Sequence, residues 1–230
     1  MAGLTPGELA IIGLSLKVAL WSVLASLPVA LALALILGRL EFRGKALLDG
    51  LVTLPLVLPP VVTGYLLLVA FGRKGPVGAF LEQNFGVVFA FRWTGAALAS
   101  AVMGLPLAVR AIRQAVEAVD VRLEAAASTL GANRLWVFAS VTLPLIAPGI
   151  LNGAMLSFAR GLGEFGATIT FVSNIPGETQ TIPLAIYGFT QVPGGDEQVW
   201  RLCLVSILLS LAALVASEWL LRAAWRRVHG

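Results

Sequence analysis

Charged side chains are scarce in this sequence. Asp, Glu, Lys and Arg make up 12% of the 230 residues, about half of their share in soluble proteins. Apolar residues make up 58%, and the mean hydropathy is +0.91. Because so few polar side chains cannot cover the surface of a soluble globule, the composition excludes a soluble protein and predicts an integral membrane protein surrounded by lipid.

Cysteine and histidine are almost absent. Cys203 is the only cysteine and His229 the only histidine, so we expect no internal disulfide, no metal site and no His-based catalytic centre. The sequence also lacks a G-x-x-x-x-G-K-[ST] phosphate loop. We therefore expect a chain that is not an enzyme, has no catalytic residues, binds no cofactor and no nucleic acid, and would need a separate ATPase for ATP-driven work.

Long uncharged stretches predict an all-α membrane fold with about five transmembrane helices. A spanning helix needs about 20 residues, and the stretches place spans at 11–38, 47–72, 93–112, 136–160 and 199–222, within one transmembrane domain covering 1–230. The segment 165–187 is ambiguous, because its apolar first half ends at a polar break containing Pro176 and Gly177. It could span, re-enter the membrane or lie at the interface.

Basic residues gather in three segments that five spans would place on one side. The segments 39–49, 110–134 and 222–230 hold ten of the sixteen Lys and Arg residues, namely Arg39, Arg43, Lys45, Arg110, Arg113, Arg122, Arg134, Arg222, Arg226 and Arg227. The positive-inside rule makes this side cytoplasmic, with the N-terminus outside and the C-terminus inside. Arg73 and Lys74, on the outer side, run against the rule.

The cytoplasmic loop 113–135 contains a predicted short helix. Asp120 can cap its N-terminus, and Gly131 can end it. The helix is rich in alanine, so a partner surface could approach its backbone closely. An ordinary connecting helix at the interface is an equally simple interpretation.

The same loop resembles the EAA loop of ABC importer permeases. That pattern reads Glu-Ala-Ala, three residues, Gly, nine residues, Ile, one residue, Leu-Pro. The Ala-Ala, Gly and Leu-Pro positions fit here at the same spacing. Ala125 stands at the glutamate position, Glu124 lies one residue earlier, and Val141 replaces Ile. These departures weaken a specific role for the glutamate and leave the small-residue face and the Leu-Pro intact.

The resemblance implies a coupling helix that inserts into a separate cytoplasmic ABC ATPase dimer, with ATP and Mg on that partner. The coupling residues it suggests are Glu124, Ala125, Ala126, Ala127, Leu130, Gly131, Leu143 and Pro144.

Three further segments place the resemblance within one branch of these permeases. Residues 159–167, Ala-Arg-Gly-Leu-Gly-Glu-Phe-Gly-Ala, are similar to the sulfate/molybdate/tungstate branch of these permeases, and residues 168–183 and 53–64 look like the molybdate permeases. The resemblance implies type I ABC importer architecture in the bacterial inner membrane. It also implies a second copy of the chain and an extracytoplasmic molybdate-binding protein, docking on loops 73–93 and 173–198. Sulfate and tungstate stay open as substrates.

Several polar residues and prolines are candidates for the pathway or its gate. Arg160 and Glu164 are four residues apart, so they can pair on one helix face. Pro59 and Pro60 break a span, which is tolerated where the helix is buried or lines a cavity. A helix-end ion pair and an ordinary proline kink are the structural alternatives. The full set is Pro59, Pro60, Thr63, Arg160, Glu164, Thr168, Ser173 and Asn174.

Other classes of membrane protein fit less well. A secondary transporter or channel would call for inverted repeats and mid-membrane carboxylates, and an intramembrane enzyme for a cluster of catalytic side chains within the spans; the sequence offers none of these. For the expected dimer, Gly104, Gly149 and Gly153 are candidate packing residues between the two copies.

Overall fold

The computed structural model describes residues 3–229, with side chains through residue 219, and these residues form helices and no strands. The all-α class is therefore confirmed. The elements in chain order are α1 (Pro6–Arg39), α2 (Lys45–Val57), α3 (Pro60–Phe71), α4 (Pro76–Phe85), α5 (Trp93–Ala118), α6 (Val121–Thr129), α7 (Arg134–Val137), the π-helix η1 (Phe138–Thr142), α8 (Leu143–Leu162), α9 (Gly166–Val172), α10 (Ile182–Thr190) and α11 (Asp196–His229).

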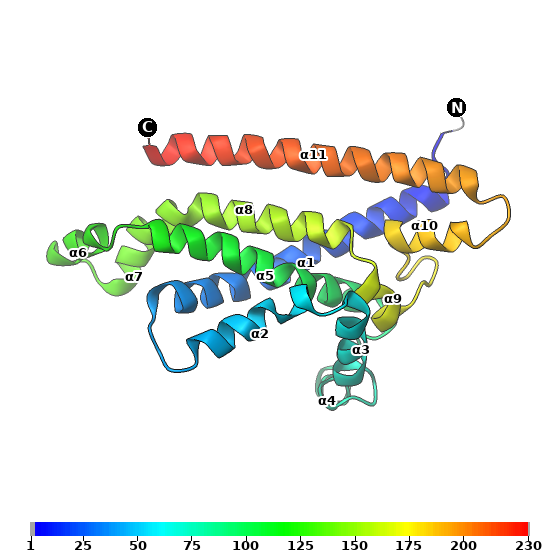
Figure 1. Cartoon of the computed structure of the whole chain (residues 1–230), viewed down its shortest axis with the longest axis horizontal. Helices are drawn as coiled ribbons and strands as arrows, with labels where there is room; N and C mark the ends of the chain where they lie inside the picture. Colours follow the sequence, from blue (N-terminus) through cyan, green and yellow to red (C-terminus); the bar gives the residue numbers. More distant parts are fainter. Residues whose placement is uncertain (1–2, 230) are drawn as a thin grey trace.

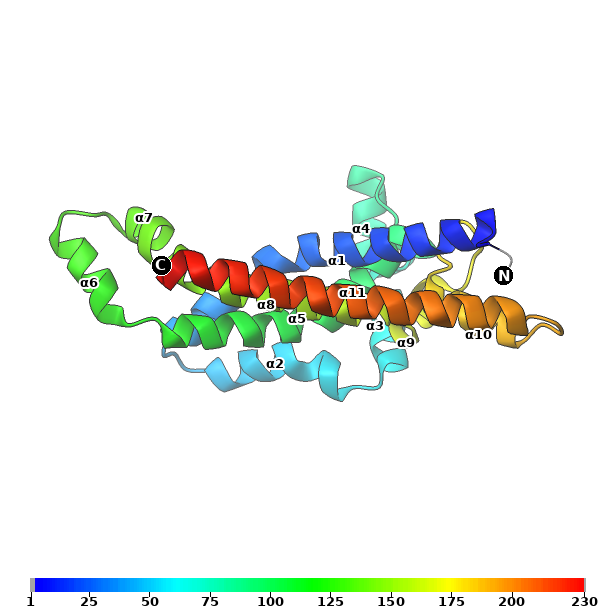
Figure 2. The same ribbon diagram turned by 90° about the horizontal axis from the view of Figure 1, so that it is seen from above.

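Four long helices, α1, α5, α8 and α11, run side by side along the molecule (Figures 1 and 2). Helix α5 is the centre of the bundle and packs against α1 and α8. In its most apolar stretch 72% of the residues are buried, against 6% in α11. Many buried residues of α5 are Gly, Ala or Ser, which let membrane helices approach closely. Helix α11 lies at the edge of the bundle, and most of its large apolar side chains between residues 200 and 219 are exposed.

The small residues offered above for a dimer contact are used within the chain, so that expectation is wrong. A side chain added at Gly104 would meet Ser157, and one added at Gly153 would lie 3.2 Å from the Cα of Ala108. Gly149 faces Ala115 in the same way. All three glycines belong to the close contact between α5 and α8, because that contact brings two backbones together at the centre of the bundle.

The stretch 47–72 is not one straight helix. Helices α2 and α3 meet at an angle of 113°, and the break falls at Leu58 and Pro59, which are extended at ψ 143° and 133°. Each of these two residues precedes a proline, and that position disfavours the helical conformation. Pro55 lies inside α2 without ending it. The break is therefore caused by the consecutive prolines at 59 and 60.

Among the described residues, length and hydropathy allow four helices to cross a membrane: α1, α5, the stretch Arg134–Leu162 and the part Asp196–Trp219 of α11. The bent pair of α2 and α3 brings the number to five if it counts as one span. The ambiguous segment 165–187 forms no continuous spanning helix. It consists of α9, with seven residues, a loop, and the first part of α10, with nine.

The two ends of the bundle carry different helices. Helices α6 and α7 lie at the end where the chain terminates, and the N-terminus and α10 lie at the opposite end (Figure 1). Ion pairs of Arg39 with Glu124 and of Arg113 with Asp49 bring the basic segments 39–49 and 110–134 together at the first end. The side chains of Arg222, Arg226 and Arg227 lie outside the described residues.

Candidate functional site

Helix α6 projects beyond the bundle, and its termini are set by the residues that flank it. The Asp120 carboxylate accepts a hydrogen bond from the backbone N–H of Arg122 at 2.9 Å, which caps the helix. Gly131, just past its end, has φ +89°, a conformation that suits glycine. The predicted helix between Asp120 and Gly131 is confirmed.

No residue of α6 is buried. Ala125 and Ala126 are exposed, Ala127 is half-buried, and Leu130 is 89% exposed. Beyond the helix, Leu135 and Trp136 are exposed too. An exposed surface that mixes alanines with large apolar side chains is suited to a protein partner that covers it.

Glu124 is the residue of α6 that reaches back into the bundle. Its Oε1 accepts hydrogen bonds from Arg39 Nη2 at 2.8 Å and from Thr142 Oγ1 at 2.7 Å. The departure from the family pattern weakened the argument for a specific role of the glutamate, yet in the structure Glu124 joins α6 to α1 and to η1. The sequence pattern missed Arg39 and Thr142, because they lie 85 and 18 residues from Glu124 and carry no spacing signal.

Helix α8 connects the two candidate regions. Leu143 and Pro144 form its first turn, where Pro144 is exposed, and Arg160 lies in its last turn. Twenty residues of α-helix extend about 30 Å. One continuous helix therefore joins the candidate coupling residues at its start to the candidate pathway residue Arg160 at its end.

Arg160 and Glu164 form the predicted ion pair at the end of α8. Arg160 Nη1 lies 2.6 Å from Glu164 Oε2, and the Glu164 side chain is almost fully buried. The other carboxylate oxygen accepts the backbone N–H of Ala167 at 2.8 Å, in the first turn of α9. The pair thus fixes how α8 joins α9, and Arg160 keeps about a quarter of its side chain exposed.

Helices α3 and α9 pack backbone to backbone. A side chain at Gly64 would lie 2.8 Å from the Cα of Ala167, and one at Gly166 would lie 2.7 Å from Pro60 Cβ. This contact brings the broken span beside the Arg160–Glu164 junction. Thr63 is buried with no hydrogen-bond partner for its hydroxyl, whereas the hydroxyl of Thr168 donates to Phe165 O at 2.8 Å.

Pro60, Thr63, Glu164 and Thr168 thus belong to one region. Pro59 is exposed at the break itself.

Ser173 and Asn174 lie past the other end of α9, in the loop that leads to α10. Ser173 is exposed with φ +62°, and its carbonyl accepts the hydroxyl of the buried Thr179 at 2.9 Å. Asn174 Nδ2 donates to Leu184 O at 3.0 Å. These bonds hold the loop in shape, so both residues are separated from the Glu164 end of the helix.

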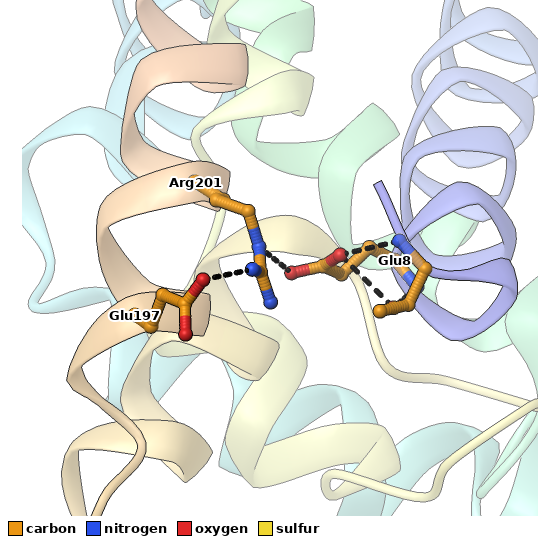
Figure 3. A network of polar contacts seen from close by, with 4 residues as sticks. Glu8, Glu197 and Arg201 are labelled. Atoms are coloured by element: carbon orange, nitrogen blue, oxygen red, sulfur yellow. Dashed lines mark hydrogen bonds and ion pairs between the residues drawn. The ribbon is translucent and has the colours of Figure 1, made fainter. Parts of the chain in front are cut away.

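The end of the bundle opposite α6 is held by a network that the sequence analysis did not identify. Figure 3 shows Arg201 of α11 between Glu8 of α1 and Glu197. Arg201 Nε donates to Glu8 Oε1 at 2.8 Å and Nη1 to Glu197 at 2.6 Å. Glu8 also accepts the N–H and hydroxyl of Thr5. The capping-box spacing of Thr5 and Glu8 was a readable signal for the start of α1.

A cavity of about 430 Å³ lies beside this network. It is lined by Glu8 and Ile11 of α1, by Pro176 and Gln180 of the loop between α9 and α10, and by Gln198 of α11. Residues of the predicted docking loop 173–198 therefore border it.

Known proteins resemble this chain over nearly its whole length. Residues 30–228 match the family model described as binding-protein-dependent transport system inner membrane component. The molybdenum transport system permease protein ModB of Haemophilus influenzae is 60% identical over 213 residues, which cover 93% of both chains. That of Escherichia coli K12 is 58% identical over 224 residues, covering 97% of this chain and 98% of the relative.

More distant proteins share the fold or part of the sequence. The sulfate transport system permease protein CysW of Synechococcus elongatus is 41% identical over 156 residues, or 68% of this chain and 54% of its own. The crystal structure of a bacterial ABC transporter that imports alginate superimposes with a TM-score of 0.71 at 19% identity, covering 99% of this chain and 82% of that one. The type I permease architecture expected from the sequence is confirmed.

The family of this chain follows from two findings: the family model matches residues 30–228, and two permeases are 58–60% identical over nearly the whole length. The chain belongs to the family of binding-protein-dependent transport system inner membrane components, which are transport proteins and not enzymes.

Proposed function

We propose that this chain is the membrane-spanning permease of an ATP-driven ABC importer that passes molybdate into the bacterial cytoplasm. The observation that carries the proposal is the 58–60% identity, over nearly the whole length, to two molybdenum transport permeases. Sulfate is the second candidate substrate. It has weaker support, because the sulfate permease is 41% identical over 68% of this chain. Tungstate, another tetrahedral dianion, is the third.

The cytoplasmic partner is an ABC ATPase dimer that receives helix α6. The exposed Ala125 and Ala126 support this, because small side chains let a groove close around the helix backbone. ATP and Mg act on that partner. One α6 per chain calls for a second copy of the permease to serve both ATPases. Exposed apolar residues, such as Leu47 of α2 and Val61 of α3, are available to that copy or to lipid.

The orientation follows from charge. The end that carries α6 holds the basic segments 39–49 and 110–134, so the positive-inside rule makes it cytoplasmic. The N-terminus then lies outside, with the loop 173–181 and the 430 Å³ cavity. An extracytoplasmic molybdate-binding protein would deliver the anion at this outer end.

Helix α8 transmits the movement that produces alternating access. Closure of the ATPases moves α6, and α8 carries the movement from Leu143 and Pro144 to the Arg160–Glu164 junction. There α9 rests on α3, directly after the break at Pro59. A bent helix that packs on a moving neighbour can serve as the gate. Arg160 is the cationic side chain at this junction, and its exposed part can meet a passing dianion.

The substrate is tested in a bacterium that keeps its molybdate ATPase and binding protein but lacks its own permease. Expression of this chain should restore accumulation of molybdenum from a medium with little molybdate. Excess tungstate should compete more strongly than excess sulfate. Restored sulfate accumulation without molybdate accumulation would move the assignment to the sulfate permeases.

The docking role of α6 is tested with a bulky side chain. The test uses Ala126→Trp, because Ala126 is exposed and helical and accepts a large side chain without backbone strain. Gly131 is less suitable, because a large residue there would strain a backbone at φ +89°. We expect normal membrane insertion and loss of copurification with the ATPase. Ala46→Trp, exposed on α2 near the same end, is the matched control and should copurify as the wild type does.

A further inference from the structure

Glu124 joins three elements at one oxygen atom. Its Oε1 accepts from Arg39 Nη2, at the end of α1, and from Thr142 Oγ1, at the end of η1. Hydrogen bonds in which one partner is charged are roughly twice as strong as neutral ones. A carboxylate that accepts two such bonds therefore fixes α6 against both α1 and the start of α8.

The Arg39–Glu124 pair is more deeply buried than an ordinary surface ion pair. Three-quarters of each side chain in the Arg39–Glu124 pair is buried, and Thr142 is buried. By contrast, α6 has no buried residue with which to pack against the bundle. A cavity of about 510 Å³ lies between Leu35 and Arg39 of α1, Glu124 and Ser128 of α6, and Val137 and Phe138. Polar contacts through Glu124 thus hold α6 where apolar packing is thin.

The attachment point on the α8 side is a π-helix. A π-helical turn is rare and frequently marks a functional site within an α-helix. Here η1 separates α7 from α8, and Thr142 is its last residue. A force on α6 therefore reaches the first turn of α8 directly through the Glu124–Thr142 bond. It does not have to pass along the chain through the loop 130–133, α7 and η1.

We infer that Glu124 is a positioning residue that transmits movement of α6 to α1 and α8 together, through Arg39 and Thr142. This rests on the proposed function, in which α6 receives the stroke of the ATPase. The role does not require Glu124 to touch the ATPase or the anion. Loss of the carboxylate should leave docking intact and lower the amount of molybdate moved per ATP hydrolysed.

The test uses proteoliposomes that contain the permease, its ATPase and the binding protein. Glu124→Gln and Arg39→Gln remove the charge from either partner, and Thr142→Val removes the hydroxyl at similar volume. The matched control is Glu41→Gln, because Glu41 pairs with Lys45 at 2.6 Å near the same end but is mostly exposed. We expect the three test variants to copurify with the ATPase while molybdate transported per ATP falls about tenfold. Glu41→Gln should keep the wild-type ratio.

A charge exchange separates coupling from simple stability. Arg39→Glu combined with Glu124→Arg restores an ion pair between α1 and α6. This double variant should recover part of the lost molybdate transport per ATP hydrolysed. An unchanged ratio in Glu124→Gln would overturn the inference. So would failure of Glu124→Gln to assemble with the ATPase, since that would make the link a structural one. Absence of ATP-dependent uptake by the wild type would instead contradict the proposed function.

Discussion

Glu8 and Arg201 are 193 residues apart in the sequence, and Arg201 Nε donates to Glu8 Oε1 at 2.8 Å. The Glu8 side chain is 2% exposed, whereas Glu197, the second partner of Arg201, is 72% exposed. The pair joins α1 to α11 (Figure 3), and the start of α1 lies at the end of the bundle opposite α6 (Figure 1). Since only 6% of the most apolar stretch of α11 is buried, this pair and the neighbouring buried Leu202 are principal attachments of the described part of that helix.

Arg201→Ala should destabilise the protein, because it leaves the buried Glu8 carboxylate without a cation. Because the Glu8 carboxylate would stay buried without its cation, thermal unfolding in detergent should begin several degrees earlier. Glu197→Gln breaks only the exposed pair and should cost less than about 1 kcal/mol. Equal shifts in the two variants would show that Glu8 does not depend on Arg201.

Gly64→Ala should weaken the contact between α3 and α9. The added methyl group would lie within 2.8 Å of the Ala167 Cα, and neither backbone can yield as a flexible side chain would. Gly50→Ala is the matched control, since Gly50 lies in α2 with nothing within 4 Å. In a helix Ala is favoured over Gly by about 1 kcal/mol. The melting temperature should therefore fall for Gly64→Ala and hold or rise for Gly50→Ala; the opposite order would contradict this packing.

Replacing Pro59 and Pro60 together by alanine should reduce uptake while ATP hydrolysis continues. The change restores two backbone donors and removes the restriction on Leu58, so α2 and α3 can run on as one helix. Pro28→Ala, inside α1, is the control and should transport normally. Uptake at the wild-type rate in the double variant would mean that the bend has no part in gating.

Arg160 and Glu164 can be tested for a role beyond structure. Arg160→Leu alone should lower the yield of folded protein, because Glu164 would remain buried and unpaired. Arg160→Leu with Glu164→Gln removes both charges and should recover the yield, measured by size-exclusion chromatography in detergent. If the pair lies on the anion pathway, uptake should stay low in this stable double variant. Uptake that returns with the yield would assign the pair to helix anchoring alone.

Local features were predictable from the sequence. The α6 helix followed from Asp120 and Gly131, because caps act over a few residues. The Arg160–Glu164 pair followed from helical spacing. Long-range partners were not predictable, because a lone Arg39 or Arg201 gives no sign of the helix that it will meet.

The errors in sequence reasoning have physical causes as well. Gly104 and Gly153 were assigned to a dimer because small residues indicate close packing without naming the partner, which is another helix of the same chain. The break in the stretch 47–72 was predicted from Pro59 and Pro60, but its angle of 113° was not, because the angle depends on the extended conformations of both Leu58 and Pro59.

The most direct test of molybdate import measures labelled molybdate entering proteoliposomes that contain this chain, the ATPase and the molybdate-binding protein. The account predicts uptake that requires ATP, the ATPase and the binding protein together, and that stops when any one is withheld. Uptake without ATP, or without the ATPase chain, would contradict it.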